Sequence, residues 1–173
     1  MTISQVSVSL DAQRVIAAGQ TRAGEIGSPS NVAVVDAGGN LVSHIRMDNA
    51  WVGSVDISIN KAFTARAFGI ATKDLAENAQ PGKQFYGIQN SNHGRVMIFA
   101  GGIPLRQVVG AVGVGGGSGE QDQAVAGAGP AAFLTSRQHD EPRRDPRWRH
   151  RSAKQFWYAS KHCPAGRTTS ATS

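Results

Sequence analysis

Polar side chains that could bind or react with a ligand gather in one short segment, residues 90–95, with the sequence NSNHGR. The segment directly precedes an apolar run, VMIFA, that we interpret as a β-strand. A loop beside a strand exposes its side chains, so the imidazole of His93 and the guanidinium of Arg95 could meet a ligand there. The alternative is a simple turn, in which the Asn and Ser side chains bond to nearby backbone groups.

A second candidate is the glycine-rich run at residues 115–119, which separates an apolar strand from a predicted helix. Free amides at a helix start favour anions, but the run lacks the spacing of a nucleotide-binding loop, and Glu120 and Asp122 add negative charge. Ser118 and Gln121 fit a capping box instead. The pattern therefore predicts a helix start rather than a phosphate site or a nucleophilic serine, with Glu120 compensating the helix dipole.

Metal and thiol chemistry has little support in the sequence. His44 and His93 are the only histidines in the first 133 residues, and they form no short-range metal motif. The lone cysteine, Cys163, excludes an internal disulfide and a thiol-linked cofactor. Lys61 follows Asn60 on a predicted helix, where we interpret both as solvated positions.

Charge divides the chain into two parts. Residues 1–133 carry nine basic and nine acidic side chains, whereas residues 134–173 carry nine basic and three acidic ones, which accounts for the whole net charge of +6. We therefore predict a domain over 1–133 and a basic tail, disordered or loosely docked, over 134–173. Arginines beside Trp148 and Tyr158 could bind nucleic acid through the tail, although a solvated tail without a ligand is the alternative.

No run of apolar residues is long enough for a membrane helix, and the first residues carry no secretory pattern. We therefore expect no membrane association and a cytoplasmic location.

The elements that position these residues follow from periodicity and turn signals. Small and apolar residues at helical spacing predict a first helix, and a Gly-Gly turn between two β-branched runs predicts a hairpin. The expected elements are helices over 9–25, 54–68 and 72–78, strands over 31–36, 41–48, 95–100, 103–107 and 108–114, and a last helix from 118. The sheet is then antiparallel with about five strands, and Pro130 should kink or end the last helix.

The core-facing sides follow from the same periods. Alternation places Leu41 and Ile45 on the buried side of the second strand. In the helix over 54–68, Ile59 and Phe63 belong to a stripe at a spacing of four residues that we expect to face the sheet.

Four segments occur in the order in which the GlcG/HbpS family carries them: VAVVDAGGNLV, DISINKAFTA, RVMIFAGGIPL and VVGAVGVGGGSGEQDQAVAGAG. The chain resembles that family over about residues 9–133. The resemblance implies an α/β domain of the α+β type, with about five antiparallel strands, helices on the sheet and a layout like that of profilin and PAS domains. It also implies homo-oligomers, often octamers. The basic tail resembles no segment of the family.

The resemblance further implies non-covalent binding of haem, another tetrapyrrole or iron. Chemistry alone then suggests His93 as the axial metal ligand and His44 as the second choice, with Arg95 or Lys61 meeting the propionates.

Two other functions stay open. The chain could be a cofactor-independent enzyme, such as a hydrolase, acting on a small oxo-, imino- or amide-bearing acid in catabolism. Arg95 would then hold a carboxylate, His93 would serve as general acid or base, and Glu120 or Asp48 would orient it. A structural or signalling oligomer is the third reading.

Overall fold

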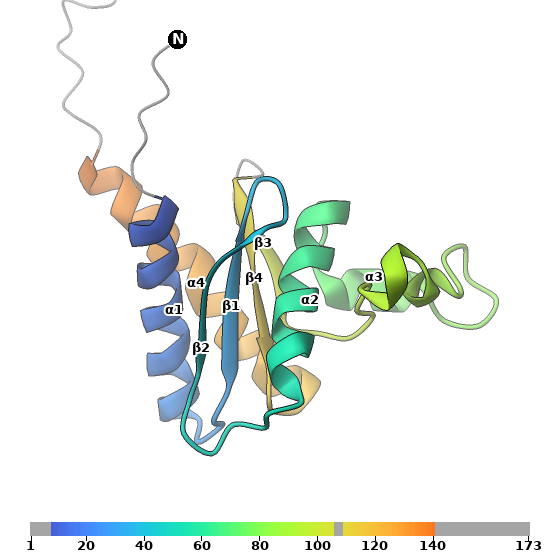
Figure 1. The fold of residues 1–173 in the computed structure, drawn as a ribbon, viewed down its shortest axis with the longest axis horizontal. Coiled ribbons are helices and arrows are strands. Elements are labelled where there is room, and N and C mark those ends of the chain that lie inside the picture. The colour runs from blue at the N-terminus through green and yellow to red at the C-terminus, as the bar shows by residue number, and fades with distance from the viewer. Residues whose placement is uncertain (1–7, 106–108, 141–173) are drawn as a thin grey trace, which may run out of the picture. The chain divides into compact units, whose positions relative to one another are not determined.

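The computed structural model describes residues 8–105 and 109–140 of the chain (Figure 1). The chain separates into a unit of residues 1–138 and a second unit of residues 139–173, and the fold below is that of the first. The expectations for the basic tail beyond residue 140, including nucleic-acid binding, lie outside the described residues, and the domain boundary near 133 stays a prediction.

Four longer helices and four strands make up the described fold. In chain order they are α1 (Val8–Glu25), β1 (Asn31–Asp36), β2 (Leu41–Arg46), α2 (Ser54–Phe68), α3 (Thr72–Asn78), β3 (Gly102–Leu105), β4 (Gly110–Gly115) and α4 (Gly119–Asp140), with short 3-10 turns at Ile88–Asn90 and Asn92–Gly94 before β3. Among the described residues no helix is both long and apolar enough to span a membrane.

The strands form one antiparallel sheet in the order β2-β1-β4-β3. The predicted α+β class is confirmed, but the described sheet has four strands rather than about five, because residues 95–100 form no strand. The Met97 amide in this segment donates to a side chain instead, Thr64 Oγ1, at 2.9 Å. The Gly101 amide, directly after the segment, likewise donates to Gln123 Oε1 at 3.1 Å.

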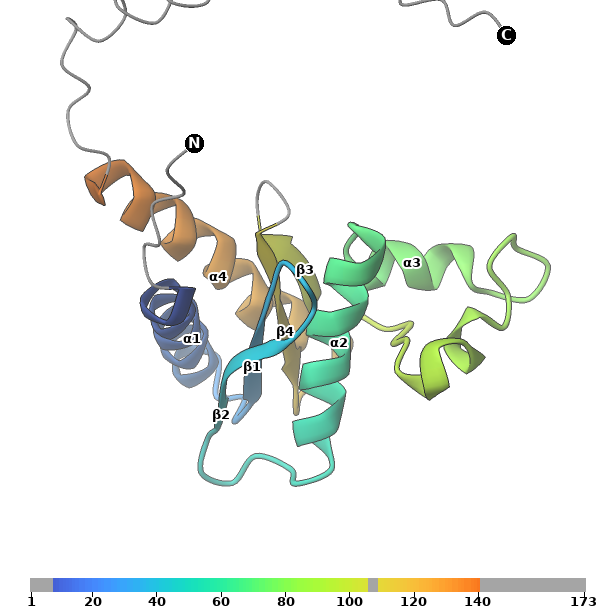
Figure 2. The same ribbon diagram turned by 45° about the horizontal axis from the view of Figure 1, so that its top comes forward.

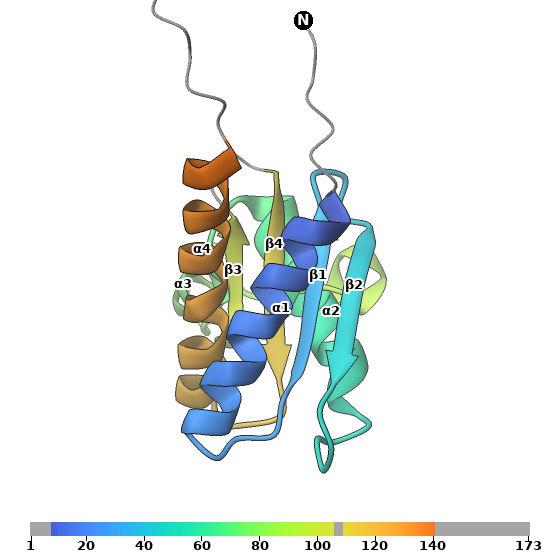
Figure 3. The same ribbon diagram turned by 90° about the vertical axis from the view of Figure 1, so that its left-hand side faces the viewer.

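Helices cover both faces of the sheet. Figure 3 shows α1 and α4 in front of the strands and α2 behind them. Alternate residues of β1 point to opposite sides, so Val32 and Val34 join the core beneath α1 and α4, whereas Ala33 and Val35 pack against α2. Figure 2 shows α3 and the segment after it extending beyond α2, away from the strands.

The contact of α2 with the sheet is unusually close because β4 has a glycine at its centre. A Cβ atom on Gly113 would lie 2.1 Å from the Ser58 carbonyl oxygen and 2.3 Å from the Ala62 amide nitrogen. The helix backbone therefore rests directly on the strand backbone. The buried side chains of α2 are small or polar. Of the predicted stripe, Ile59 packs against the core between α2 and the sheet but is only partly buried, as is Phe63, so the prediction holds only in part.

Two further local predictions need correction. The pairing of β1 with β2 shifts register between Val34 and Val35, which leaves Val42 as an extra residue and Leu41 exposed instead of in the core. The last helix continues through Pro130 to Asp140, so the expectation that it could end there is wrong, whereas the alternative of a kink stays a prediction. Val125 and Phe133 are buried on either side of the proline, and their packing holds the helix across the lost hydrogen bond.

Candidate functional site

A lysine and a carboxylate from opposite faces of the sheet meet in the interior. Lys61 Nζ, from α2, donates to Asp122 Oδ2, in the first turn of α4, at 2.6 Å. Lys61 is 1% exposed and Asp122 is 4% exposed. The prediction that Lys61 is a solvated helix position is therefore wrong, because its side chain crosses from one helical layer to the other.

Glycine makes room for this crossing. A Cβ on Gly101 would lie 2.8 Å from Asp122 Cβ and 3.1 Å from Lys61 Nζ, and its φ of +111° also disfavours a side chain. The other oxygen of Asp122, Oδ1, accepts from the Gly117 amide at 3.0 Å. The ring of Phe99, which is 45% exposed, covers the ammonium at 4.9 Å from the ring centroid.

Burial sets the electrostatics of the pair. Removal from water lowers the pKa of the Lys61 ammonium, while the hydrogen bond and charge of Asp122 oppose that shift. Burial likewise raises the pKa of the Asp122 carboxyl, with Lys61 and the Gly117 amide opposing. The pair thus joins α2, α4 and the Gly101 segment at one point, and each partner depends on the other to remain charged.

Sequence reasoning identified Lys61 but missed Asp122 as its partner. The capping box beside Asp122 is confirmed: the Gln121 amide donates to Ser118 Oγ at 3.3 Å, and the Ser118 amide donates to Gln121 Oε1 at 2.9 Å. The capping box correctly predicted the position at which α4 starts. It could not show which residue of that first turn faces inward.

A second cationic group packs against α2. The Arg95 guanidinium stacks on the Phe63 ring, with its central carbon 3.8 Å from the ring centroid. Arg95 Nε donates to Asn60 Oδ1 at 3.3 Å. Thr64 Oγ1 donates to the Arg95 carbonyl oxygen at 3.3 Å, so both backbone and side chain are held against α2.

His93 lies two residues before Arg95 and is exposed. Its φ is +58°, and Asn92 and Gly94 also have positive φ values of 51° and 75°. Consecutive residues in this left-handed region form a turn, as the Asn- and Ser-rich sequence predicts. The hydrogen bonds among the described residues include no partner for the His93 imidazole.

The other predicted site residues do not join this group. His44 lies on β2 with its Nε2 buried and without a hydrogen-bond partner in the described part of the chain, and burial lowers the pKa of its imidazole. Glu120 and Asp48 are exposed. The described residues show no hydrogen bond from Glu120, Asp48 or His44 to His93 or Arg95.

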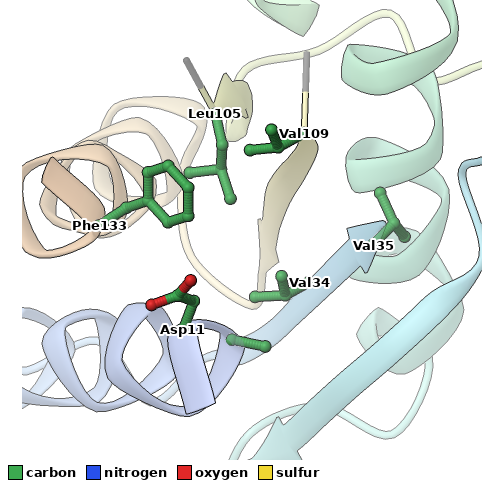
Figure 4. A pocket seen from close by; sticks show the side chains of 7 residues that line it. Asp11, Val34, Val35, Leu105, Val109 and Phe133 are labelled. Carbon is green, nitrogen blue, oxygen red and sulfur yellow. The ribbon is translucent and has the colours of Figure 1, made fainter. Parts of the chain in front are cut away.

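A small cavity, partly open to solvent, lies on the α1 and α4 side of the sheet (Figure 4). Its lining is apolar apart from Asp11, whose carboxylate points toward Phe133 in Figure 4 and forms an ion pair with Arg14 at 3.5 Å. The cavity contains none of the predicted site residues. Within residues 8–105 and 109–140, no cluster of three or more His, Cys, Asp or Glu side chains could hold a bare metal ion.

These features define the class of protein as a small α+β domain with a helix-covered antiparallel sheet. The family model described as haem-degrading protein HbpS-like matches residues 9–131. The chain belongs to this HbpS-like family, which confirms the resemblance found in the sequence.

Individual relatives agree with that assignment. The chain is 44% identical over 118 residues to an uncharacterized 15.0 kDa protein of the dhaT-dhaS intergenic region of Citrobacter freundii, covering 66% of this chain and 83% of that protein. Klebsiella pneumoniae protein ORFY superposes with a TM-score of 0.72 at 41% identity, covering 78% of this chain and 97% of ORFY. The PduOC:haem complex gives a TM-score of 0.68 at 36% identity, covering 70% of this chain and 91% of PduOC.

Proposed function

We propose that this protein binds haem or a related tetrapyrrole non-covalently, with His93 as the axial ligand. The observation that carries the proposal is the exposed His93 imidazole, which has no hydrogen-bond partner among the described residues. The existence of a haem complex of PduOC, a structural relative at 36% identity, supports the choice of ligand. One free imidazole is sufficient for haem, because the porphyrin nitrogens already supply the four equatorial ligands of the iron.

The arrangement around His93 suits a tetrapyrrole better than a bare metal ion. The Arg95 guanidinium lies two residues away and is available for a propionate through charge-assisted bonds. Lys61 is less suited to that role because its ammonium is buried and paired with Asp122. His44 remains the second choice as ligand, since its Nε2 would have to become accessible first.

Self-association would allow a second subunit to cover the face of the tetrapyrrole that points away from His93. Phe85 and Tyr86 lie between α3 and His93, and they are 39% and 65% exposed. An exposed haem edge and exposed aromatic rings both favour burial against a partner. We therefore propose a homo-oligomer in which the segment between α3 and β3 contacts a second copy.

A haem titration followed by absorbance tests the proposal. The full chain is used with the potential ligands of the tail, His139, His150, His162 and Cys163, replaced by alanine. We expect a saturable Soret shift at one haem per subunit or per pair of subunits. His93→Ala should abolish the shift, and His44→Ala, the matched control, should retain it.

Two results would contradict the assignment. A Soret shift that persists in His93→Ala would reject His93 as the ligand, and the absence of a saturable shift in the parent would reject tetrapyrrole binding. In the second case the small-acid enzyme becomes the leading hypothesis. Its minimum requirement is that turnover be lost in His93→Ala and Arg95→Ala while the circular dichroism spectrum is unchanged.

A further inference from the structure

The plane of the Arg95 guanidinium is fixed by two contacts that use different parts of the group. The Phe63 ring covers one face at 3.8 Å, and Asn60 Oδ1 accepts from Nε at 3.3 Å. Asn60 is itself held, because its Nδ2 donates to Asp56 Oδ2 at 2.8 Å. An arginine side chain normally samples many rotamers. Because these contacts already restrict the side chain, a ligand loses less binding free energy to ordering it.

These contacts leave the outer end of the guanidinium free. No hydrogen bond from Nη1 or Nη2 of Arg95, and no ion pair of Arg95 with an acidic side chain, occurs among the described residues. Elsewhere in the described chain, Arg22 pairs with Glu25 at 2.9 Å. Arg95 is therefore a half-buried, oriented cation whose two terminal nitrogens have no protein acceptor there.

We propose that the two Nη groups of Arg95 form a binding site for one carboxylate of a small organic acid. A planar carboxylate matches the guanidinium fork through two parallel N–H···O bonds. Because Asn60 already occupies Nε, the carboxylate binds end-on, through Nη1 and Nη2. Asn60 and Phe63 act as positioning residues.

The surrounding charge favours a monoanion over a phosphate. The Asp56 carboxylate is hydrogen-bonded to the same Asn60 side chain that accepts from Arg95. Its negative charge repels a dianion more strongly than a monoanion, whereas a single carboxylate is matched in charge by one guanidinium.

The inference goes beyond the proposed function because it concerns the carboxylate and not the tetrapyrrole. Propionate groups are carboxylates and would use the same fork. A small acid without a porphyrin should nevertheless bind, so failure of haem binding would leave this site intact, and failure of this site would leave iron ligation by His93 untouched.

The test is a titration of the full chain, labelled with ¹⁵N, followed through the arginine Nε–Hε signals in NMR spectra. Sodium benzoate is the probe, and sodium chloride and sodium phosphate are titrated at equal ionic strength. We expect the Arg95 signal to shift saturably with benzoate, with a dissociation constant on the order of 1–10 mM for two charge-assisted bonds at a half-exposed site. The Arg22 signal is the internal control and should not saturate.

Three variants make the geometry testable. Arg95→Lys keeps the charge but loses the fork, and benzoate binding, followed in the parent and in this variant through the side-chain amide signal of Asn60, should weaken at least about tenfold. Asn60→Leu removes the acceptor for Nε, and binding should weaken roughly threefold to tenfold. Arg22→Lys, the matched control, should bind benzoate as the parent does. Circular dichroism verifies that each variant is folded.

Any of three outcomes overturns the proposal. A linear shift of the Arg95 signal that chloride reproduces would mean that no carboxylate site exists. Equal benzoate affinity in Arg95→Lys would mean that only charge, and not the oriented fork, attracts the ligand. Tighter binding of phosphate than of benzoate would likewise reject a monocarboxylate site. Since the parent titration requires no substitution, the proposal is testable even if Asn60→Leu fails to fold.

Discussion

Replacing Asp122 with alanine would leave the Lys61 ammonium buried without its counter-ion. Losing one partner of a buried pair costs about 3–5 kcal/mol. The upper bound follows from the lysine itself, which can escape by losing its proton. Neutralising a group of ordinary pKa 10.5 at pH 7 costs about 4.8 kcal/mol, at about 1.36 kcal/mol per pH unit. We therefore expect Asp122→Ala to lose 3–5 kcal/mol, a large part of the roughly 5–15 kcal/mol of a typical domain.

Urea unfolding followed by circular dichroism measures this loss, and Glu120→Ala is the matched control. Glu120 lies in the same first turn of α4 but is exposed, so its removal should cost at most about 1 kcal/mol of helix-dipole energy. The double variant Lys61→Met/Asp122→Leu should recover most of the stability, because an apolar pair of similar size carries no desolvation cost.

The pH dependence gives a signature that lost packing alone would not show. In Asp122→Ala, burial lowers the pKa of Lys61 with no carboxylate to oppose it. Between that lowered pKa and 10.5 the unfolded chain binds more protons than the folded one, so stability should rise with pH by up to about 1.4 kcal/mol per unit. A loss below 1 kcal/mol, or one that is independent of pH up to 10, would refute the reasoning.

Two other expectations concern the sheet. Gly113→Ala should prevent α2 from docking and lower the free energy of unfolding by more than about 4 kcal/mol, because its Cβ would lie 2.1 Å from the Ser58 carbonyl oxygen. Gly127→Ala, whose Cβ would have no neighbour within 4 Å, should instead raise the free energy of unfolding by about 0.5–1 kcal/mol. Urea unfolding midpoints compare the two variants. Burial lowers the pKa of His44 below its ordinary value of 6.5, so in the range just below pH 6.5 the unfolded chain binds more protons than the folded one. The free energy of unfolding therefore decreases as the pH is lowered through that range. His44→Gln should remove that part of the decline between pH 7 and 5, and an unchanged pH profile would contradict it.

The parts of the fold that were predictable are those whose signals are local. The β1–β2 hairpin follows from β-branched runs about a Gly-Gly turn, and α2 and α3 have the bounds expected from their spacing. The start of α4 was found through Ser118 and Gln121, whose mutual bonds involve neighbours three residues apart. In each case the residues that decide the structure lie within a few positions of one another.

The errors share a different cause, which is a partner distant in the sequence. The apolar run over 95–100 has strand-like composition, yet its Met97 amide bonds to Thr64, 33 residues earlier. Lys61 has an ordinary solvated-helix pattern, and only Gly101 and Asp122 make an interior position for it. Neither partner can be inferred from periodicity, because periodicity describes a single element and not what packs on it.

The adjacent residues Asn60 and Lys61 of α2 make contacts in two separate groups of side chains. Successive helical positions differ by about 100°, so Lys61 bonds to Asp122 while Asn60 points in another direction and orients Arg95. The two groups share no hydrogen bond in the described chain. Stability lost in Asp122→Ala should therefore leave benzoate binding of the folded protein unchanged, and Arg95→Lys should weaken binding without the pH-dependent instability. Joint loss would mean that the segment between Arg95 and Phe99 transmits strain from the buried pair to the guanidinium.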